Sequence, residues 1–247
     1  MKRFFRDVNI PPRNVTVHHL RAWLAKEKQR GISDVTLNGN RDVFSSMFGW
    51  LWRESLIERD PTGNLMPIRY QKKVLEPIPA VDIEKLKSVC IDQRNLAIIC
   101  FLLATGCRIS EVVSLNRDQI NFHDKTVVVL GKGNKQRTVY FDDVTAMHLQ
   151  NYLNSRTDNL PALFIGKRTD RFQDNGVRVM LKKLAKQAGV ENIHPHRFRR
   201  TLATMLIAHG MPIQEVSAIL GHEKLDTTMK YIRLDDSMVK NDYKKFA

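Results

Sequence analysis

Apolar residues recur at helical spacing over residues 15–52, in two separate stretches. The first stretch contains Leu20, Trp23 and Leu24, and the second contains Val43, Phe44, Met47, Phe48 and Leu51. Residues 31–36 between them begin with a glycine, and Ser33 is placed to cap the second helix. The pattern predicts a small helical domain made of two helices joined by a turn.

The helical pattern ends at Asp60, Pro61, Thr62 and Gly63, and the sequence up to Pro79 has no periodicity. We therefore predict a helical domain over residues 1–70, a linker over 71–79 and a second domain over 80–247. The basic linker is equally compatible with lying along a phosphate backbone and with being solvated.

The second domain is predicted to be mainly helical with one small β-structure, an α+β fold. Helices are expected over 82–89, 96–105, 177–188, 196–209, 212–220 and 227–232. The 96–105 segment is apolar on nearly all sides, which predicts a central position in the core. Val- and Thr-rich segments at 125–130 and 137–141 flank a glycine-containing loop, which predicts a hairpin with a basic tip.

The composition of the chain indicates which classes of partner and cofactor to expect. Forty Lys and Arg residues against 26 Asp and Glu give a net charge of +14, so the first partner to consider is a polyanion, and nucleic acid before all others. The basic residues are not gathered beside a long apolar span, which argues against a membrane. The three cysteines match no zinc spacing, and we expect a reducing cytoplasm. No glycine-rich nucleotide loop is found, so we expect no ATP, metal or other cofactor.

Four local signals could carry chemistry, and each also has a plain structural interpretation. Arg108 follows a helix-ending glycine, but it could simply pair with Glu111 at the surface. Lys132 and Lys135 lie in a glycine-rich hairpin tip, where lysine is common in any soluble turn. The other two signals are His196 with Arg199 on one helix face, and His222 with Tyr231 nine residues later.

In this order and spacing, the four signals resemble the catalytic domain of the tyrosine recombinases, or phage integrases, over residues 77–231. Residues 31–61 also resemble the helical core-binding domain of that family, with a less diagnostic pattern. The resemblance implies two phosphate-clamping arginines, a hairpin lysine, two histidines and a tyrosine nucleophile, namely Arg108, Arg199, Lys132, His196, His222 and Tyr231. Lys135 remains the alternative to Lys132.

Two features depart from the family pattern. Arg200 stands where related sequences often carry histidine, which should tune activity without removing it. Residues 1–5 resemble the end of the family's first helix, so the resemblance implies that this helix and any arm-binding domain before it are missing.

The resemblance implies cleavage and rejoining of double-stranded DNA through a 3′-phosphotyrosine, without ATP or metal. It also implies a homotetramer on two DNA sites. The tail could support this assembly, because residues 235–237 could cap a final helix that exchanges between subunits. The apolar residues of that helix are Met238, Val239, Tyr243 and Phe246, which could instead pack on their own domain.

The expected activity is site-specific recombination, with integration or excision of a mobile element as its setting. The strand-transfer chemistry is identical for inversion and chromosome-dimer resolution, and the sequence does not reveal the DNA site. Two alternatives are a type IB topoisomerase, which shares the tyrosine chemistry but acts as a monomer, and a noncatalytic DNA-binding regulator with the same fold.

Overall fold

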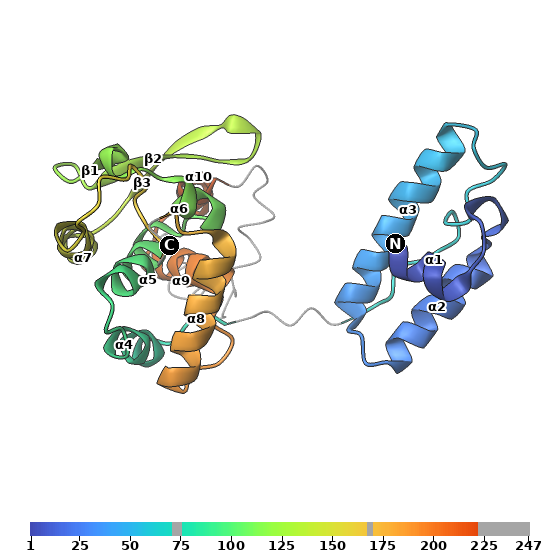
Figure 1. The fold of residues 1–247 in the computed structure, drawn as a ribbon, viewed down its shortest axis with the longest axis horizontal. Coiled ribbons are helices and arrows are strands. Elements are labelled where there is room, and N and C mark those ends of the chain that lie inside the picture. The colour runs from blue at the N-terminus through green and yellow to red at the C-terminus, as the bar shows by residue number, and fades with distance from the viewer. Residues whose placement is uncertain (71–75, 167–169, 222–247) are drawn as a thin grey trace, which may run out of the picture. The chain divides into compact units, whose positions relative to one another are not determined.

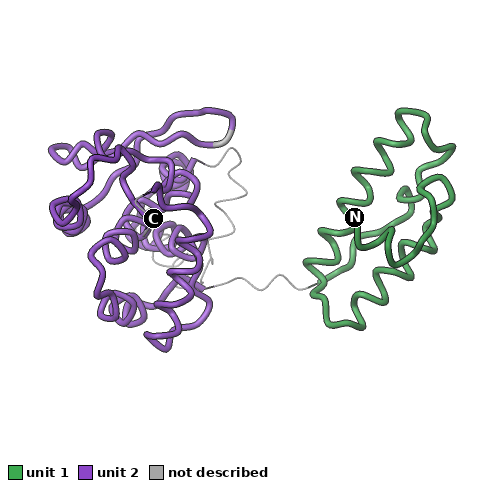
Figure 2. The backbone as a smooth tube through the Cα atoms, viewed as in Figure 1, with its two compact units in different colours: residues 1–73 green, residues 74–247 purple. Residues whose placement is uncertain are grey.

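The computed structural model describes residues 1–70, 76–166 and 170–221, and of Lys132 only the backbone. The chain forms two compact units, Met1–Lys73 and Val74–Ala247 (Figure 2). His222, Tyr231 and the tail helix predicted after residue 237 therefore lie outside the described residues, as does the helix expected over 227–232.

Unit 1 contains three α-helices: α1 (Lys2–Val8), α2 (Val17–Gln29) and α3 (Asp34–Arg53), with a short 3-10 turn at Pro12–Asn14 (Figure 1). The two predicted helices are confirmed as α2 and α3, and the Ser33 side chain caps α3 by accepting from Thr36 N at 3.4 Å. Their shared core is aromatic. The Phe4 ring of α1 meets the rings of Trp23 and Phe44 edge to face, with centroids 5.7 and 4.9 Å apart.

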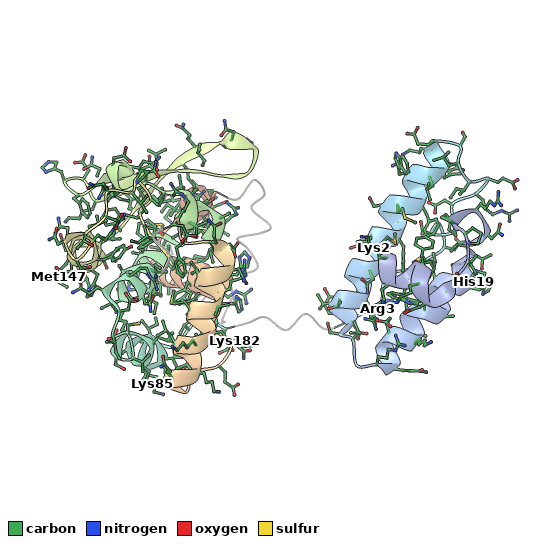
Figure 3. All side chains as sticks on the ribbon, in the orientation of Figure 1. Lys2, Arg3, His19, Lys85, Met147 and Lys182 are labelled. Carbon is green, nitrogen blue, oxygen red and sulfur yellow. The ribbon has the colours of Figure 1, made fainter. Side chains whose placement is uncertain are left out.

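A buried carboxylate joins α1 to α2. Glu27 on α2 is 1% exposed and pairs with Arg3, which Figure 3 labels on α1, at 3.1 Å. Arg30 binds the same carboxylate at 2.7 Å. A buried charge needs such partners, so this pairing fixes where α1 lies in unit 1.

Unit 2 is built around α5 (Gln93–Thr105), whose residues 97–102 are all buried, as the sequence predicted. α7 (Asp143–Asn154) and α9 (Pro195–Ala208) pack against α5. α8 (Asp174–Ala188) packs against α4 (Ala80–Ser88) and α6 (Ile109–Ser114), while α10 (Ile213–Leu220) packs against α9. α7 was not expected from the sequence, although its buried residues Ala146, Leu149 and Tyr152 recur at helical spacing.

The predicted hairpin is confirmed within a three-stranded antiparallel sheet of β1 (Ile120–Asn121), β2 (Thr126–Leu130) and β3 (Gln136–Tyr140). Val127 pairs with Val139, and both side chains are buried against the core. Lys132 lies in the 3-10 turn Lys132–Asn134 at the hairpin tip, and α10 contacts β3 (Figure 1). The expected mainly helical α+β fold is therefore correct.

Gly106 ends α5, as predicted, with a positive φ of 57°. A β-carbon there would lie 2.9 Å from side-chain atoms of Leu202 and Leu220, so the site needs glycine for space as well as for conformation. The chain turns sharply at this residue and presents Arg108 as the N-cap of α6. None of the helices described between residues 1 and 221 is long and apolar enough to cross a membrane.

Candidate active site

Three arginines from different elements meet at the carboxyl end of α10. Arg137 Nε on β3 donates to the carbonyl of Ile219 at 2.9 Å, and Arg108 Nη2 donates to that of Gly221 at 3.1 Å. Arg199 Nη2 donates to the intervening carbonyl of Leu220. The last carbonyls of a helix have no intrahelical donor and carry the negative end of its dipole. The end of α10 therefore organises three positive side chains.

Glu111 lies at the centre of this cluster, with 3% of the residue exposed. Its two oxygens accept from Arg137 Nη1 at 2.8 Å and Arg137 Nη2 at 2.7 Å, a bidentate pair. Glu111 also accepts from the backbone N–H of Arg108 at 2.7 Å and from Arg108 Nη1 at 3.0 Å. The pairing of Arg108 with Glu111 considered from the sequence is thus present, but Glu111 is buried rather than superficial.

The same contacts fix the protonation state of Glu111. Burial raises the pKa of this carboxyl, but hydrogen bonds from Arg137 and Arg108 and the charge of Arg137 outweigh burial, so the pKa lies below its ordinary value. Glu111 is therefore ionised at neutral pH and balances part of the arginine charge.

Arg199 projects from the first half of α9 into the core of the cluster and is 4% exposed. Its Nη1 donates to the carbonyl of Gly106 at 2.9 Å, next to the turn that presents Arg108. The structure thus brings Arg108 and Arg199, both predicted site residues, to one place between the ends of α5 and α10.

His196 lies one turn before Arg199 on α9, and its side chain is exposed. Partial loss of hydration lowers the pKa of His196, and the positive charges of Arg178, Arg199 and Arg108 lower it further, while Asp174 opposes the shift. His196 is therefore within electrostatic reach of both predicted arginines, and its imidazole is mostly neutral at pH 7.

Two residues of the cluster were not among the predicted site residues. Arg137 was assigned only to a strand, and Glu111 only as an alternative partner of Arg108. A capping-box signal at Arg108 and Glu111 was available, because the N3 carboxylate of α6 binds the N-cap N–H. No local signal marks Arg137, which meets Glu111 from 26 residues away.

Cys107 also lies in this region and is 1% exposed. Burial raises the pKa of its thiol to about 11, which leaves it protonated and unreactive at neutral pH. The described residues contain no cluster of three or more His, Cys, Asp or Glu side chains that could hold a metal ion.

A helical unit precedes an α+β unit in which two predicted site arginines meet at a helix end, as expected for a DNA strand transferase of the tyrosine type. The family model described as "Phage integrase family" matches residues 76–238. The tyrosine recombinase XerC of Bacillus licheniformis is 30% identical over 93% of this chain and 80% of its own, and XerC of Corynebacterium efficiens is 31% identical over 87% and 73%. The chain belongs to the phage integrase family, and its activity is site-specific tyrosine recombination.

Solved structures agree in fold. The Tn1549 transposon integrase, in complex with a circular intermediate DNA, matches 100% of this chain and 92% of its own at a TM-score of 0.81 and 17% identity. The XerH site-specific recombinase bound to difH in a pre-cleavage complex matches 93% of this chain and 70% of its own at a TM-score of 0.73 and 19% identity. The XerC relatives do not favour the topoisomerase and noncatalytic alternatives.

Proposed function

We propose that this recombinase cuts and rejoins double-stranded DNA through a phosphotyrosine formed by Tyr231, with Arg108 and Arg199 holding the reacting phosphate. The observation that carries this proposal is their convergence: they donate to the adjacent carbonyls of Gly221 and Leu220. A guanidinium has five N–H donors in a rigid fork, a geometry that matches the oxygens of a phosphate.

The roles follow from the charge that develops during the reaction. Attack of the Tyr231 oxygen on phosphorus adds negative charge to the nonbridging oxygens, which Arg108 and Arg199 would neutralise. A tyrosine with a reference pKa of about 10 needs a base, and neutral His196 is our candidate to take its proton. As the bond from phosphorus to the 5′ oxygen breaks, Lys132 would protonate that oxygen.

The remaining product is a 3′-phosphotyrosine, with His222 as a hydrogen-bond donor to the phosphate. Rejoining reverses the step: a 5′ hydroxyl attacks phosphorus, and the tyrosine oxygen leaves. Because the ester conserves the energy of the broken bond, rejoining needs no ATP.

Unit 1 fits the expected helical DNA-binding domain, and we assign residues 1–70 to DNA binding, 71–79 to the linker and 80–247 to catalysis. The Tn1549 integrase and XerH structures are DNA complexes, which supports DNA as the partner here. Since chromosomal or mobile DNA is the substrate, we place the protein in the cytoplasm.

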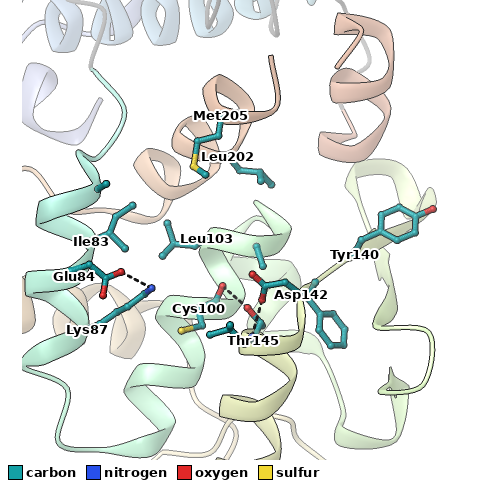
Figure 4. A pocket seen from close by; sticks show the side chains of 14 residues that line it. Ile83, Glu84, Lys87, Cys100, Leu103, Tyr140, Asp142, Thr145, Leu202 and Met205 are labelled. Carbon is teal, nitrogen blue, oxygen red and sulfur yellow. Dashed lines mark hydrogen bonds and ion pairs between the residues drawn. The ribbon is translucent and has the colours of Figure 1, made fainter. Parts of the chain in front are cut away.

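We further propose a homotetramer on two DNA sites in which the C-terminal tail of one subunit docks on another. Unit 2 carries a groove of about 510 Å³ whose apolar lining includes Ile83, Leu103, Leu202 and Met205 (Figure 4). The occupant we assign is the tail segment 238–246, which carries Met238, Val239, Tyr243 and Phe246. The groove has the size and polarity to take such side chains.

A covalent-trapping assay tests the proposed chemistry. Nicked DNA carrying candidate recombination sites is incubated with wild type and with Tyr231→Phe, and a protease-sensitive slow band is sought. We expect the band from wild type alone. Tight binding to that DNA with no adduct from wild type would instead support a noncatalytic DNA-binding protein.

A further inference from the structure

Arg137 occupies a position that the proposed catalytic roles do not explain. Its side chain is 11% exposed, and Nε, Nη1 and Nη2 all donate inside the protein. A guanidinium committed in this way does not contact DNA directly. Burying a charge costs free energy unless the charge is paired and hydrogen-bonded. The contacts of Arg137 offset this cost, but they do not explain why an arginine is buried here.

The contacts of Arg137 join three segments that are distant in sequence. The residue itself belongs to β3, next to the hairpin tip. Its carboxylate partner Glu111 lies on α6 and binds Arg108 at both the backbone and the side chain. Its carbonyl partner, Ile219, lies at the end of α10, one residue before the carbonyl that receives Arg199.

We propose that Arg137 is a positioning residue for strand cleavage, which sets Arg108 through Glu111 and holds the end of α10 through Ile219. This inference rests on the proposed function, because it assigns a residue that places the phosphate-clamping arginines. Arg137 does not touch the reacting atoms. Instead, it binds the carboxylate that orients Arg108, and it binds the carbonyl of Ile219, which precedes the two carbonyls that Arg199 and Arg108 contact.

The contact of Arg137 with Ile219 also bears on the segment that carries the proposed nucleophile. Residue 222, proposed to bind the phosphate, directly follows Gly221, and the chain leading to Tyr231 starts there. An arginine that fixes Ile219 therefore fixes the starting point of the segment that carries the nucleophile. One guanidinium would in this way couple the clamp to the tyrosine segment.

The test compares Arg137→Ala and Arg137→Lys with wild type in two assays on the same nicked DNA: equilibrium binding and the single-turnover rate of adduct formation. We expect unchanged DNA affinity and an adduct rate lowered by about 10²-fold, in the range for a lost preorganised donor. Lysine keeps the charge but cannot bind Glu111 bidentately, so it should restore little of the rate.

Arg156 is the matched control for a merely structural arginine. Its side chain is 2% exposed, it pairs with Asp158 through Nε and Nη2 at 3.0 and 2.5 Å, and it donates to the carbonyl of Ala162 at 2.6 Å. Arg156 therefore makes the same kinds of contact as Arg137, a bidentate carboxylate pair and a hydrogen bond to a carbonyl, at a distance from the arginine cluster around Glu111. Arg156→Ala should lose stability comparably and keep its adduct rate at a temperature where both variants are folded.

A second substrate distinguishes a defect in the phosphate-clamping arginines from the loss of the proton donor at the hairpin tip. In this DNA, sulfur replaces the 5′ bridging oxygen, so the leaving group needs no proton. Lys132→Ala is the reference variant, because it should lack the proton donor. The sulfur-containing DNA should therefore restore its rate of adduct formation. The Arg137 defect should persist on this DNA.

The outcomes distinguish the two proposals. No adduct from wild type on either DNA defeats the proposed function itself. If wild type reacts, the Arg137 inference is overturned by a wild-type rate in Arg137→Ala, by an equal loss in Arg156→Ala, or by rescue of the Arg137 variants with the sulfur substrate.

Discussion

Gly221 lies directly against Arg137: a β-carbon on Gly221 would come within 2.9 Å of Arg137 Cδ and 3.2 Å of its Nε. The same glycine caps α10 with φ at 64°, in the left-handed region. Gly189 caps α8 with the same φ, but a β-carbon there would meet no atom within 4 Å. The two glycines therefore share a conformation and differ in what surrounds them.

Gly221→Ala should be more harmful than Gly189→Ala. Both variants carry the conformational cost of alanine at positive φ, about 1 kcal/mol. Only Gly221→Ala must also displace Arg137, so we expect a further loss of unfolding free energy of about 1–3 kcal/mol from overpacking, together with slower adduct formation. Chemical denaturation and covalent trapping measure the two effects. Equal losses in both variants would contradict a role for the Arg137 contact.

Glu111→Gln should lower the unfolding free energy by about 3 kcal/mol at neutral pH, because it leaves buried arginine charge without its partner. The folded pKa of Glu111 lies below its ordinary value, so the carboxylate stabilises the protein above pH of about 4.3 and loses this effect as pH falls through the folded pKa. The difference in unfolding free energy between wild type and Glu111→Gln should therefore become smaller at acidic pH.

Denaturation curves across this pH range check the prediction. Glu215→Gln, the same substitution at an exposed position of α10, should change stability by no more than about 0.5 kcal/mol. A Glu111→Gln effect that stays constant from neutral to acidic pH would show that the ionised carboxylate is not its source.

The adduct rate should depend on the protonation of His196. Because its pKa is lowered from 6.5, a neutral base is available at pH 7, and the rate should fall only below pH of about 6.5. Among the neighbouring charges, that of Arg178 lowers the pKa of His196 most. Arg178→Gln should therefore raise the pKa of His196 and move the acidic limb of the rate profile to higher pH.

Lys183→Gln provides the control, since it removes one positive charge from another side of α8, beside Asp92 and Phe172. Single-turnover rates of the three proteins across pH 5–8 should show a shifted limb in Arg178→Gln only. Identical profiles would exclude His196 as the group that titrates.

Assembly should depend on the groove lined by Leu202 and Met205. Met205 is 48% exposed, so Met205→Glu should fold normally while placing a charge where the tail segment would dock. We expect single-site DNA binding to persist and the two-site tetramer to be lost in light scattering. Val179→Glu, at a 60% exposed position on α8 outside this groove, should assemble like wild type.

If deletion of residues 238–247 leaves assembly intact while Met205→Glu abolishes it, another surface occupies the groove. If both changes leave the tetramer intact, tail exchange through this groove is wrong. Destabilisation of an isolated monomer by the deletion would indicate that the tail packs on its own subunit.

Much of the fold is encoded locally. The all-round apolar character of α5 predicted its central place, and Gly106 predicted its end, because a helix terminates easily at a residue that tolerates positive φ. Val- and Thr-rich segments on either side of a glycine-containing loop predicted the hairpin. By contrast, no periodicity predicted α1, and only the resemblance of residues 1–5 to the end of a helix pointed to it. A helix this short is stabilised mainly by packing, here the buried Phe4 and the Arg3–Glu27 pair.

The sequence by itself determined where three residues stand relative to the helices: Arg108 after the α5 cap, Arg199 within α9 and Gly221 at the end of α10. Those are local properties of chain direction and helix termination. The tertiary structure alone decided that Arg137 meets Glu111 across 26 residues, that it meets Ile219 across 82, and that Arg108 meets Gly221 across 113. Such contacts follow from how the elements pack in three dimensions, and no local periodicity carries that information.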